Sequence, residues 1–461
     1  MNSVLRNLEI DKLRIRAFFC FSKLLIIFLL IFPVKLYAET DKLAQIDHII
    51  VIYMENHSFD NLFGTFTNAN GFKNAGDKII QTDANDKPYE FLPKVTIGKE
   101  KEVDKRFPKN LPNKPFLISK YISENEKTSD LVHRFYQLQE QINNGKMDKF
   151  SSVSNAGGLT QGYYENKNSP LWQYAKKYTL ADNFFTGVFG GSFVNHIFLV
   201  CGCIPKYESA PQDIRAELDK NGRLIKDGAL TPDGYAVNTI EPFNPPYKKK
   251  ATDAAKRLPP MKEPNIGDRL SEKNIDWAWY AGSWNKANSG NAEEPFIPHH
   301  QPFVYFANYS ENSPARKAHL KDLEDFIAAI ESNSLPAVSF YKPDGKFDIH
   351  PGYANLAEGE EHIFEIVNKI ENSKLWDKSL IIITFDDAGG WFDHVMPPKF
   401  DRFGAGERVP TIIISPFAKR NFIDKTLYDT ASILKLIETK FGLQPFNARD
   451  KNAGDLTNAL Q

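Results

Sequence analysis

The sequence predicts an α/β fold, with a mostly parallel central sheet and helices on both of its faces. Three apolar, β-branched runs support this prediction, at residues 46–54, 379–385 and 409–415. Short runs that are apolar throughout are typical of strands buried on both faces of a parallel sheet. Amphipathic helical patterns lie between the runs, and helices that alternate with buried strands indicate an α/β architecture.

Shorter patterns predict the remaining elements. Ser313 and Pro314 suit the N-cap and first turn of a helix, which is predicted to continue to Ile330 because apolar residues recur at helical spacing. The other predicted elements are two weaker strands and two helices: 276–280, 337–341, 361–370, and a helix from 429 or 430 to about Gly442.

The first 38 residues have the pattern of a secretory signal peptide. Basic residues precede an apolar run at 24–32, and Ala38 stands where cleavage would fall. The run is short for a transmembrane helix, although Leu36, at a position that prefers a small residue, leaves an uncleaved anchor as the alternative. We therefore expect export to the periplasm or the medium, a single domain over 39–461, and no stable membrane span after processing.

Two polar segments interrupt the alternation of strands and helices. Residues of about 70–115 are rich in lysine, and residues of about 205–275 contain turn signals and a basic run, Lys248-Lys249-Lys250. Segments of this kind are predicted to be surface insertions that form a cap over the core sheet, rather than independent domains.

The charge balance and the cysteine content limit the classes of ligand that the protein can bind. The 57 lysine and arginine residues nearly cancel the 58 aspartate and glutamate residues, so no basic excess is available to bind a nucleic-acid backbone. A small phosphorylated substrate remains compatible with this balance, and nothing in the composition indicates an oligomeric state. Outside the signal segment, which contains Cys20, the only cysteines are Cys201 and Cys203. A structural thiol pair beside an apolar strand is favoured over a local disulfide, and a zinc site is disfavoured because it needs about four ligands.

Oxygen-bearing side chains follow two of the best predicted strands. Glu55 and Asn56 come after the first strand, and Asp386 and Asp387 come after the run that ends at Phe385. Ligands of open parallel sheets bind at the carboxyl ends of the strands, and crowded carboxylates there could share a divalent cation. The same residue types also suit turns and N-caps, so spacing alone leaves both interpretations open.

Ser192 and several histidines are the other candidate functional residues. Gly190 and Gly191 allow a tight turn that would present the Ser192 hydroxyl, but a turn capped by serine remains the alternative. Val194 takes the place of the second glycine of a G-x-S-x-G elbow, which disfavours a lipase-type esterase. Histidines near their free pKa can bind phosphate or protonate a leaving group, and any one of them can also be structural. Those beside polar or turn residues are His133, His196, His299, His300, His350 and His394.

Two long motifs carry a family resemblance. Residues 54–64 read Met-Glu-Asn-His-Ser-Phe-Asp-Asn-Leu-Phe-Gly, and residues 386–395 read Asp-Asp-Ala-Gly-Gly-Trp-Phe-Asp-His-Val. Together they resemble the signatures of the bacterial phosphoesterase family that joins AcpA-type acid phosphatases and phosphatidylcholine-type phospholipases C. The resemblance covers about residues 45–443 and implies a fold related to that of alkaline phosphatase.

The resemblance also implies a mechanism. Ser192 would be the nucleophile, and one divalent metal ion would bind both its oxygen and the residues Glu55, Asn56, Asp386 and Asp387. Phosphate-facing histidines would be His133, His300 and His350, with Asn195, His196 and His299 as further substrate-binding residues. Oxygen-rich ligation suggests calcium, magnesium or manganese, although zinc also accepts carboxylates.

The two branches of the family differ around the nucleophile. Phospholipase C members usually have threonine in Gly-Pro-Thr-x-Pro-Asn-Arg and Asp-Glu-Pro before Gly-Gly, whereas this chain has Gly-Gly-Ser-Phe-Val-Asn-His and Asp-Asp-Ala. These departures favour a secreted acid phosphatase that hydrolyses phosphomonoesters. A phospholipase C acting on phosphatidylcholine-type diesters is the alternative. An exported module that binds a phosphorylated ligand without hydrolysis is the alternative of another class, and it would not need Ser192.

Overall fold

The structure is a computed structural model that describes residues 42–98, 101–292 and 296–461. The predicted signal peptide, residues 1–38, lies outside the described residues. Residues 42–44 form a short helical turn in one unit of the chain, and residues 47–461 form a second, compact unit that contains all elements discussed below. Within the described ranges, none of the helices combines the length and the apolarity that crossing a membrane requires.

An eight-stranded sheet forms the core, in the order β11-β10-β12-β1-β13-β14-β6-β15. Only β14 runs against its neighbours, so the mostly parallel sheet predicted from the sequence is confirmed. The strands span β1 His48–Met54, β6 Thr179–Ala181, β10 Trp277–Ala281, β11 Leu320–Lys321, β12 Val338–Lys342, β13 Ser379–Phe385, β14 Thr411–Ile414 and β15 Phe422–Asp424.

The register of β1 and β13 brings the two sequence motifs together. Every residue of β1 except the first is buried, and all of β13 is buried, as their apolar sequences predict. The strands pair in parallel, with Met54 beside Phe385, and Asp386 N donates to Met54 O at 3.1 Å. The residues that follow the two strands therefore emerge at one edge of the sheet.

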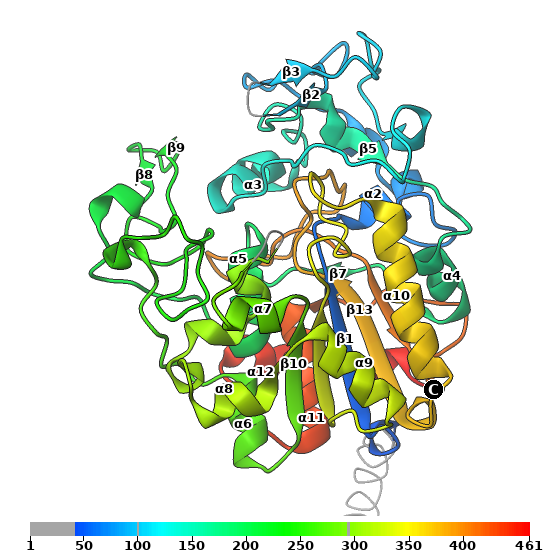
Figure 1. The fold of residues 1–461 in the computed structure, drawn as a ribbon. Coiled ribbons are helices and arrows are strands. Elements are labelled where there is room, and N and C mark those ends of the chain that lie inside the picture. The colour runs from blue at the N-terminus through cyan, green and yellow to red at the C-terminus, as the bar shows by residue number, and fades with distance from the viewer. Residues whose placement is uncertain (1–41, 99–100, 293–295) are drawn as a thin grey trace, which may run out of the picture. The chain divides into compact units, whose positions relative to one another are not determined.

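Helices cover both faces of the sheet. Figure 1 shows α9 and α10 in front of the strands and α11 behind them. Helix α10 packs against α9 and α4, whereas α11 packs against α5 and α12. Their bounds are α4 Pro170–Lys177, α5 Ser192–Cys201, α9 Leu323–Glu331, α10 Leu356–Glu371, α11 Thr430–Phe441 and α12 Ala448–Asn452.

The single helix predicted from Ser313 to Ile330 is wrong. The structure has α8 at Pro314–His319 and then the short strand β11, which pairs with β10 before α9 begins. Asp322 caps α9 with a capping box that includes Asp325. The apolar spacing continues through the break because Leu320 is buried in the sheet rather than on a helix face.

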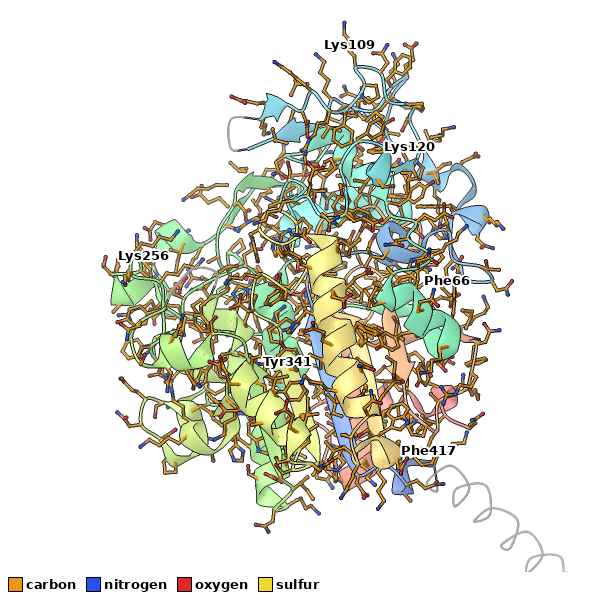
Figure 2. All side chains as sticks on the ribbon, turned by 45° about the vertical axis from the view of Figure 1, so that its right-hand side comes forward. Phe66, Lys109, Lys120, Lys256, Tyr341 and Phe417 are labelled. Carbon is orange, nitrogen blue, oxygen red and sulfur yellow. A yellow bond between two sulfur atoms is a disulfide. The ribbon has the colours of Figure 1, made fainter. Side chains whose placement is uncertain are left out.

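The first polar segment and the part of the second at residues 217–226 lie toward the carboxyl ends of the strands (Figure 1). Residues 70–115 contain the short strands β2 (Thr96–Ile97) and β3 (Glu102–Val103), and Figure 2 shows Lys109 at the end of the molecule opposite Phe417. Residues 205–275 contain the hairpin of β8 (Glu217–Leu218) and β9 (Leu224–Lys226). Their last part is not an insertion, because α6 (Ile266–Glu272) packs against β10 of the core sheet.

Cys201 and Cys203 form a disulfide, with an S–S distance of 2.05 Å, at the end of α5. The thiol pair beside a strand that the sequence favoured is therefore wrong in both respects. Cys201 is the last residue of a helix whose ten residues are all buried, so the pattern read as an apolar strand belongs to a core helix.

Candidate active site

Ser192 is the first residue of α5, directly after a tight turn. Gly190 has a φ of +103°, which disfavours any residue with a Cβ atom. A Cβ atom at Gly191 would lie 3.0 Å from the carbonyl oxygen of His133, so both glycines are required for the close approach of these segments. The turn leaves Ser192 only 7% exposed, with its hydroxyl directed at the residues that follow β1 and β13.

Four predicted metal ligands and the nucleophile meet at this point. Ser192 Oγ lies 3.2 Å from Glu55 Oε2, 3.2 Å from Asp387 Oδ2 and 3.4 Å from Asn56 Oδ1. Asn56 Oδ1 is in turn 2.9 Å from Glu55 Oε2 and 2.9 Å from Asp386 Oδ1. We call these five residues (Glu55, Asn56, Ser192, Asp386 and Asp387) the oxygen cluster.

The oxygen cluster fits a divalent cation. Carboxylate oxygens of Glu55 and Asp387 and the Asn56 side-chain amide crowd around Ser192 Oγ, and Asp386 Oδ2 is buried without a hydrogen-bond partner. Buried carboxylates that lie this close repel one another unless a cation lies between them. Oxygen ligands converging from several segments are the donor set that hard divalent ions bind.

The protonation equilibria of the cluster show the same crowding. Burial, followed by the charges of Glu55 and Asp387, raises the pKa of Asp386 well above its usual range. Burial also raises the pKa of Asp387 to about 6, although His133 opposes this shift. Each carboxylate makes the others harder to ionise, and a bound cation would relieve that repulsion.

Lys342, which the sequence analysis missed, supports Glu55 from β12. Its Nζ lies 2.9 Å from Glu55 Oε1, and His300 Nε2 lies 2.7 Å from the same oxygen. Although burial opposes ionisation, Lys342 and His300 hold the pKa of Glu55 well below its usual range. Because Lys342 and His300 both contact Oε1, the other carboxylate oxygen of Glu55, Oε2, is available to Ser192. The same arrangement places His300, which the resemblance implied to be phosphate-facing, in contact with the Glu55 carboxylate.

His133 and His350 border the oxygen cluster on its open side. Asn56 Nδ2 lies 3.2 Å from His133 Nε2 and 2.9 Å from His350 Nε2. Both rings line a cavity of about 530 Å³ that also contains Ser192. Burial opposes protonation of His133, but the charges of Asp387 and Asp130 raise its pKa, whereas burial lowers the pKa of His350.

The three residues predicted to bind substrate have different surroundings. Asn195 is fully buried, and its amide bonds the backbone of the turn before Ser192: Oδ1 accepts from Val188 N at 3.0 Å, and Nδ2 donates to Gly190 O at 3.2 Å. His196 is also fully buried, with Nδ1 2.8 Å from Ser192 O. Of the three, only His299 lines the cavity. Asn195 and His196 therefore contact the backbone around Ser192, and the substrate-binding role predicted for them stays a prediction.

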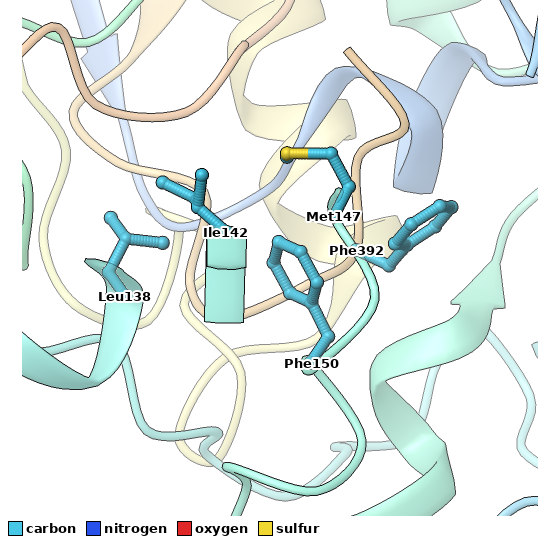
Figure 3. Close-up of a cluster of buried hydrophobic side chains, with 5 residues drawn as sticks. All are labelled: Leu138, Ile142, Met147, Phe150 and Phe392. Carbon is cyan, nitrogen blue, oxygen red and sulfur yellow. The ribbon is translucent and has the colours of Figure 1, made fainter. Parts of the chain in front are cut away.

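A second group of charged residues connects the two motifs behind the site. Arg408 Nη2 lies 3.0 Å from Asp60 Oδ1, and Arg408 Nε lies 3.1 Å from Asp393 Oδ1. His394 Nδ1 is 2.6 Å from Asp60 Oδ2. We call these four buried residues (Asp60, Asp393, His394 and Arg408) the arginine cluster. Phe392, which precedes Asp393 in the sequence, packs into the apolar group shown in Figure 3, with Leu138, Ile142, Met147 and Phe150.

The comparison with known families decides the identity of the chain. The model of the Phosphoesterase family matches residues 46–444, which include both motifs and the whole site. The chain belongs to this family. It is accordingly a phosphoric-ester hydrolase, and nothing described above favours the alternative of a module that binds without hydrolysis.

Relatives of this phosphoesterase differ in their activities. Phospholipase C A of Mycobacterium tuberculosis is 25% identical over 455 residues, which cover 91% of this chain and 78% of the relative. A probable acid phosphatase of Kluyveromyces lactis is 26% identical over 208 residues, 43% of this chain and 46% of the relative. Among solved structures, an alkaline phosphatase superfamily protein of Vibrio parahaemolyticus is similar at 12% identity and a TM-score of 0.34, over 66% of each chain.

Proposed function

We propose that this phosphoesterase hydrolyses phosphomonoesters through a phosphoserine at Ser192, with one divalent ion in the oxygen cluster. One observation carries the proposal. The Ser192 hydroxyl lies among oxygen atoms of Glu55, Asn56 and Asp387 at the edge of a cavity that two histidines also line. Serine needs activation to act as a nucleophile, and this surrounding provides it.

The chain's own residues account for each step. The Ser192 hydroxyl hydrogen-bonds to Glu55 Oε2 and Asp387 Oδ2, which orient the oxygen for attack. The hydroxyl proton passes to Asp387 as a bond forms between Oγ and phosphorus, while the bond to the leaving oxygen breaks and that oxygen takes a proton from His133. Water then attacks phosphorus and gives a proton to His133, the bond to Oγ breaks, Oγ takes the proton back from Asp387, and inorganic phosphate leaves. When bound, a divalent ion would lower the pKa of the hydroxyl and offset the charge of the phosphate.

His133 is the proposed proton donor and phosphate contact. Neighbouring carboxylates raise its pKa, so that it is cationic at mildly acidic pH, and it lines the cavity beside Ser192. His350 is the proposed second contact, because its Nε2 lies on the same side of Asn56. His300 is proposed to orient Glu55 instead, since its Nε2 is held by that carboxylate.

Phospholipase C activity is the second candidate. The similarity to the mycobacterial phospholipase C extends over 91% of the chain, whereas the acid phosphatase relative covers 43%. The monoesterase is preferred because the residues around Ser192 depart from the phospholipase pattern, and because His133 offers a cation to a dianionic phosphate. The metal is proposed to be calcium, magnesium or manganese, with zinc as the alternative, since its ligands are all oxygen atoms.

Hydrolysis of p-nitrophenyl phosphate and p-nitrophenyl phosphorylcholine tests the two candidates. Both substrates are to be assayed between about pH 4.5 and about pH 8, with and without chelator, for the wild type and Ser192→Ala. The proposal expects preferential turnover of the monoester at acid pH, lost in the variant and in chelator. Preference for the choline diester would instead support phospholipase C activity. Metal analysis of the purified protein identifies the ion.

Export is proposed from the signal pattern at residues 1–38. We expect the protein to accumulate in the periplasm or medium with a new N-terminus near Glu39, which mass spectrometry of the mature protein would detect. Retention of the full N-terminus in the membrane fraction would instead indicate an uncleaved anchor.

A further inference from the structure

The cavity beside Ser192 has walls from two distant parts of the chain. Residues 130–134 and Asn155 form one wall, and Asn238, Lys248 and Ile297 contribute to the other. The second wall includes the segment 205–275, which the family motifs do not contain. The phosphate-facing histidines lie near Ser192, so the remaining lining surrounds the space open to the rest of the substrate.

The charged groups that line the cavity differ in whether an ion-pair partner balances their charge. The Arg134 guanidinium forms an ion pair with Asp227 and donates to Gly228 O at 3.2 Å, so its charge is largely balanced. Asp130 lies 3.7 Å from His133 Nδ1. By contrast, within the described part of the chain no carboxylate lies within ion-pair distance of the Lys248 ammonium. Its backbone N–H is held by Glu241 Oε2 at 3.0 Å, which fixes the base of a half-buried side chain.

Lys248 also lies beside the site, because it lines the same cavity as Ser192 and His299. The His299 ring packs 6.3 Å from that of Phe193, the residue after the nucleophile. Lys249 and Lys250, by contrast, are fully exposed and do not line the cavity. One lysine of the basic run is therefore set apart by its position.

We propose that Lys248 binds a second anionic group, a carboxylate or a further phosphate, on the leaving-group side of the substrate. This inference rests on the proposed function and narrows its substrate class to monoesters whose alcohol is itself anionic. An unbalanced ammonium attracts such a group directly and repels a cationic one. Choline and ethanolamine esters are accordingly poor substrates of this site.

Matched phosphate esters test the inference. Wild type, Lys248→Gln, Lys248→Glu and the control Lys249→Gln are to be compared on 4-carboxyphenyl phosphate, phenyl phosphate and choline phosphate. We expect Lys248→Gln to raise KM for the carboxylated ester about tenfold while leaving kcat and the phenyl ester nearly unchanged. Lys248→Glu should go further and lower KM for choline phosphate. Lys249→Gln should behave as the wild type.

Binding without turnover separates this inference from the proposed function. Calorimetry is used to measure the affinities of the same four proteins for phenylphosphonate and 4-carboxyphenylphosphonate, which the enzyme does not cleave. Loss of the preference for the carboxylated ligand in Lys248→Gln supports the inference, even if no ester is hydrolysed and the proposed function fails. Hydrolysis of phenyl phosphate with an equal carboxylate preference in wild type and Lys248→Gln overturns the inference alone. An equal effect of Lys249→Gln, or no binding of either phosphonate, also overturns it.

Discussion

The oxygen cluster and the arginine cluster come from the same two sequence motifs but balance their charge differently. In the arginine cluster, two buried aspartates share the guanidinium of Arg408, which also donates to Asp182 O at 2.9 Å. In the oxygen cluster, the lysine contact among the described residues goes to the far oxygen of Glu55. The oxygens that face Ser192 have no lysine or arginine partner in the described part of the chain and are bordered by histidines, with His350 Nε2 3.8 Å from Glu55 Oε2. Acidic residues at a strand end therefore indicate a metal site only where the chain supplies no cation of its own.

This difference assigns the clusters separate tasks. The arginine cluster is complete within the chain, so it can hold the two motifs in place before any ion binds. The oxygen cluster has no such shared cation among the described residues, and a divalent ion that binds there would relieve the repulsion among its carboxylates, which favours binding. Each prediction below perturbs one cluster and uses the other, or a matched residue, as the control.

Catalysis should depend on the oxygen cluster alone, and this is the largest expected effect. Ser192→Ala removes the nucleophile, so we expect kcat for p-nitrophenyl phosphate to fall by about 10³-fold or more. The control is Ser58→Ala, which removes a hydroxyl that donates to Phe392 O at 2.8 Å beside the arginine cluster. That variant should lose about 1–2 kcal/mol of unfolding free energy and keep most of its kcat. Comparable kcat losses in both variants would contradict the separation.

Stability should depend on the arginine cluster whether or not metal is bound. Arg408→Met removes the guanidinium that Asp60 and Asp393 share and leaves Asp393 buried without its ion-pair partner, so we expect the free energy of unfolding to fall by about 3–5 kcal/mol. Arg402, whose side chain is 52% exposed and pairs with Asp233, is the matched control. Arg402→Met should change the unfolding free energy by less than about 1 kcal/mol. Denaturant titration with and without chelator measures both, and a chelator-dependent loss in Arg408→Met would contradict the assignment.

Removing one carboxylate should have opposite effects in the two clusters when metal is absent. In chelator, Asp386→Asn relieves repulsion among buried oxygens, so we expect the unfolding free energy to rise by about 1–2 kcal/mol. Asp393→Asn should lower it, because Arg408 loses a partner. Thermal unfolding in chelator and then with added calcium or manganese measures both signs. If the ion stabilises Asp386→Asn as strongly as the wild type, the oxygen cluster is not its site.

Local sequence patterns correctly predicted the features that depend on neighbouring residues in the chain, such as the positions of the buried strands. The strands around 48–54 and 379–385 are apolar throughout because both faces are buried, so their positions and the residues after them could be read from the sequence. The break at Leu320 could not be read in the same way, because β11 exists through its pairing with β10. The capping box at Asp322 and Asp325 was the available local signal.

The contacts of the site depend on strand order, which no local pattern carries. From the sequence, Lys342 could be predicted only as the end of a strand. It reaches Glu55, 287 residues earlier in the sequence, because β12 pairs with β1, with Ile52 opposite Tyr341. The neighbours of His300 and Asn195 could not be predicted for a similar reason. A residue type chosen for phosphate also binds a carboxylate or a backbone amide, and only the fold decides which partner it meets.

Glu360, a buried carboxyl outside both clusters, shows what happens when neither arginine nor metal is available. It is 4% exposed, Ser169 Oγ donates to its Oε1 at 3.0 Å, and burial raises its pKa to about 8. Because this pKa exceeds that of an unfolded glutamate, about 4.3, the folded protein binds the proton more tightly, and stability should fall as the pH rises between the two values.

Glu360→Gln keeps the shape of that side chain and removes its titration, which gives the smallest predicted effect. We expect the variant to match the wild type near about pH 5 and to exceed it by roughly 1–3 kcal/mol of unfolding free energy near about pH 8. The exposed Glu361→Gln is the matched control and should show no such dependence. A wild-type advantage at high pH would mean that the Glu360 carboxylate has a charged partner. Glu360 would then be stabilised by a charged partner, as the carboxylates of the arginine cluster are, and not by binding a proton.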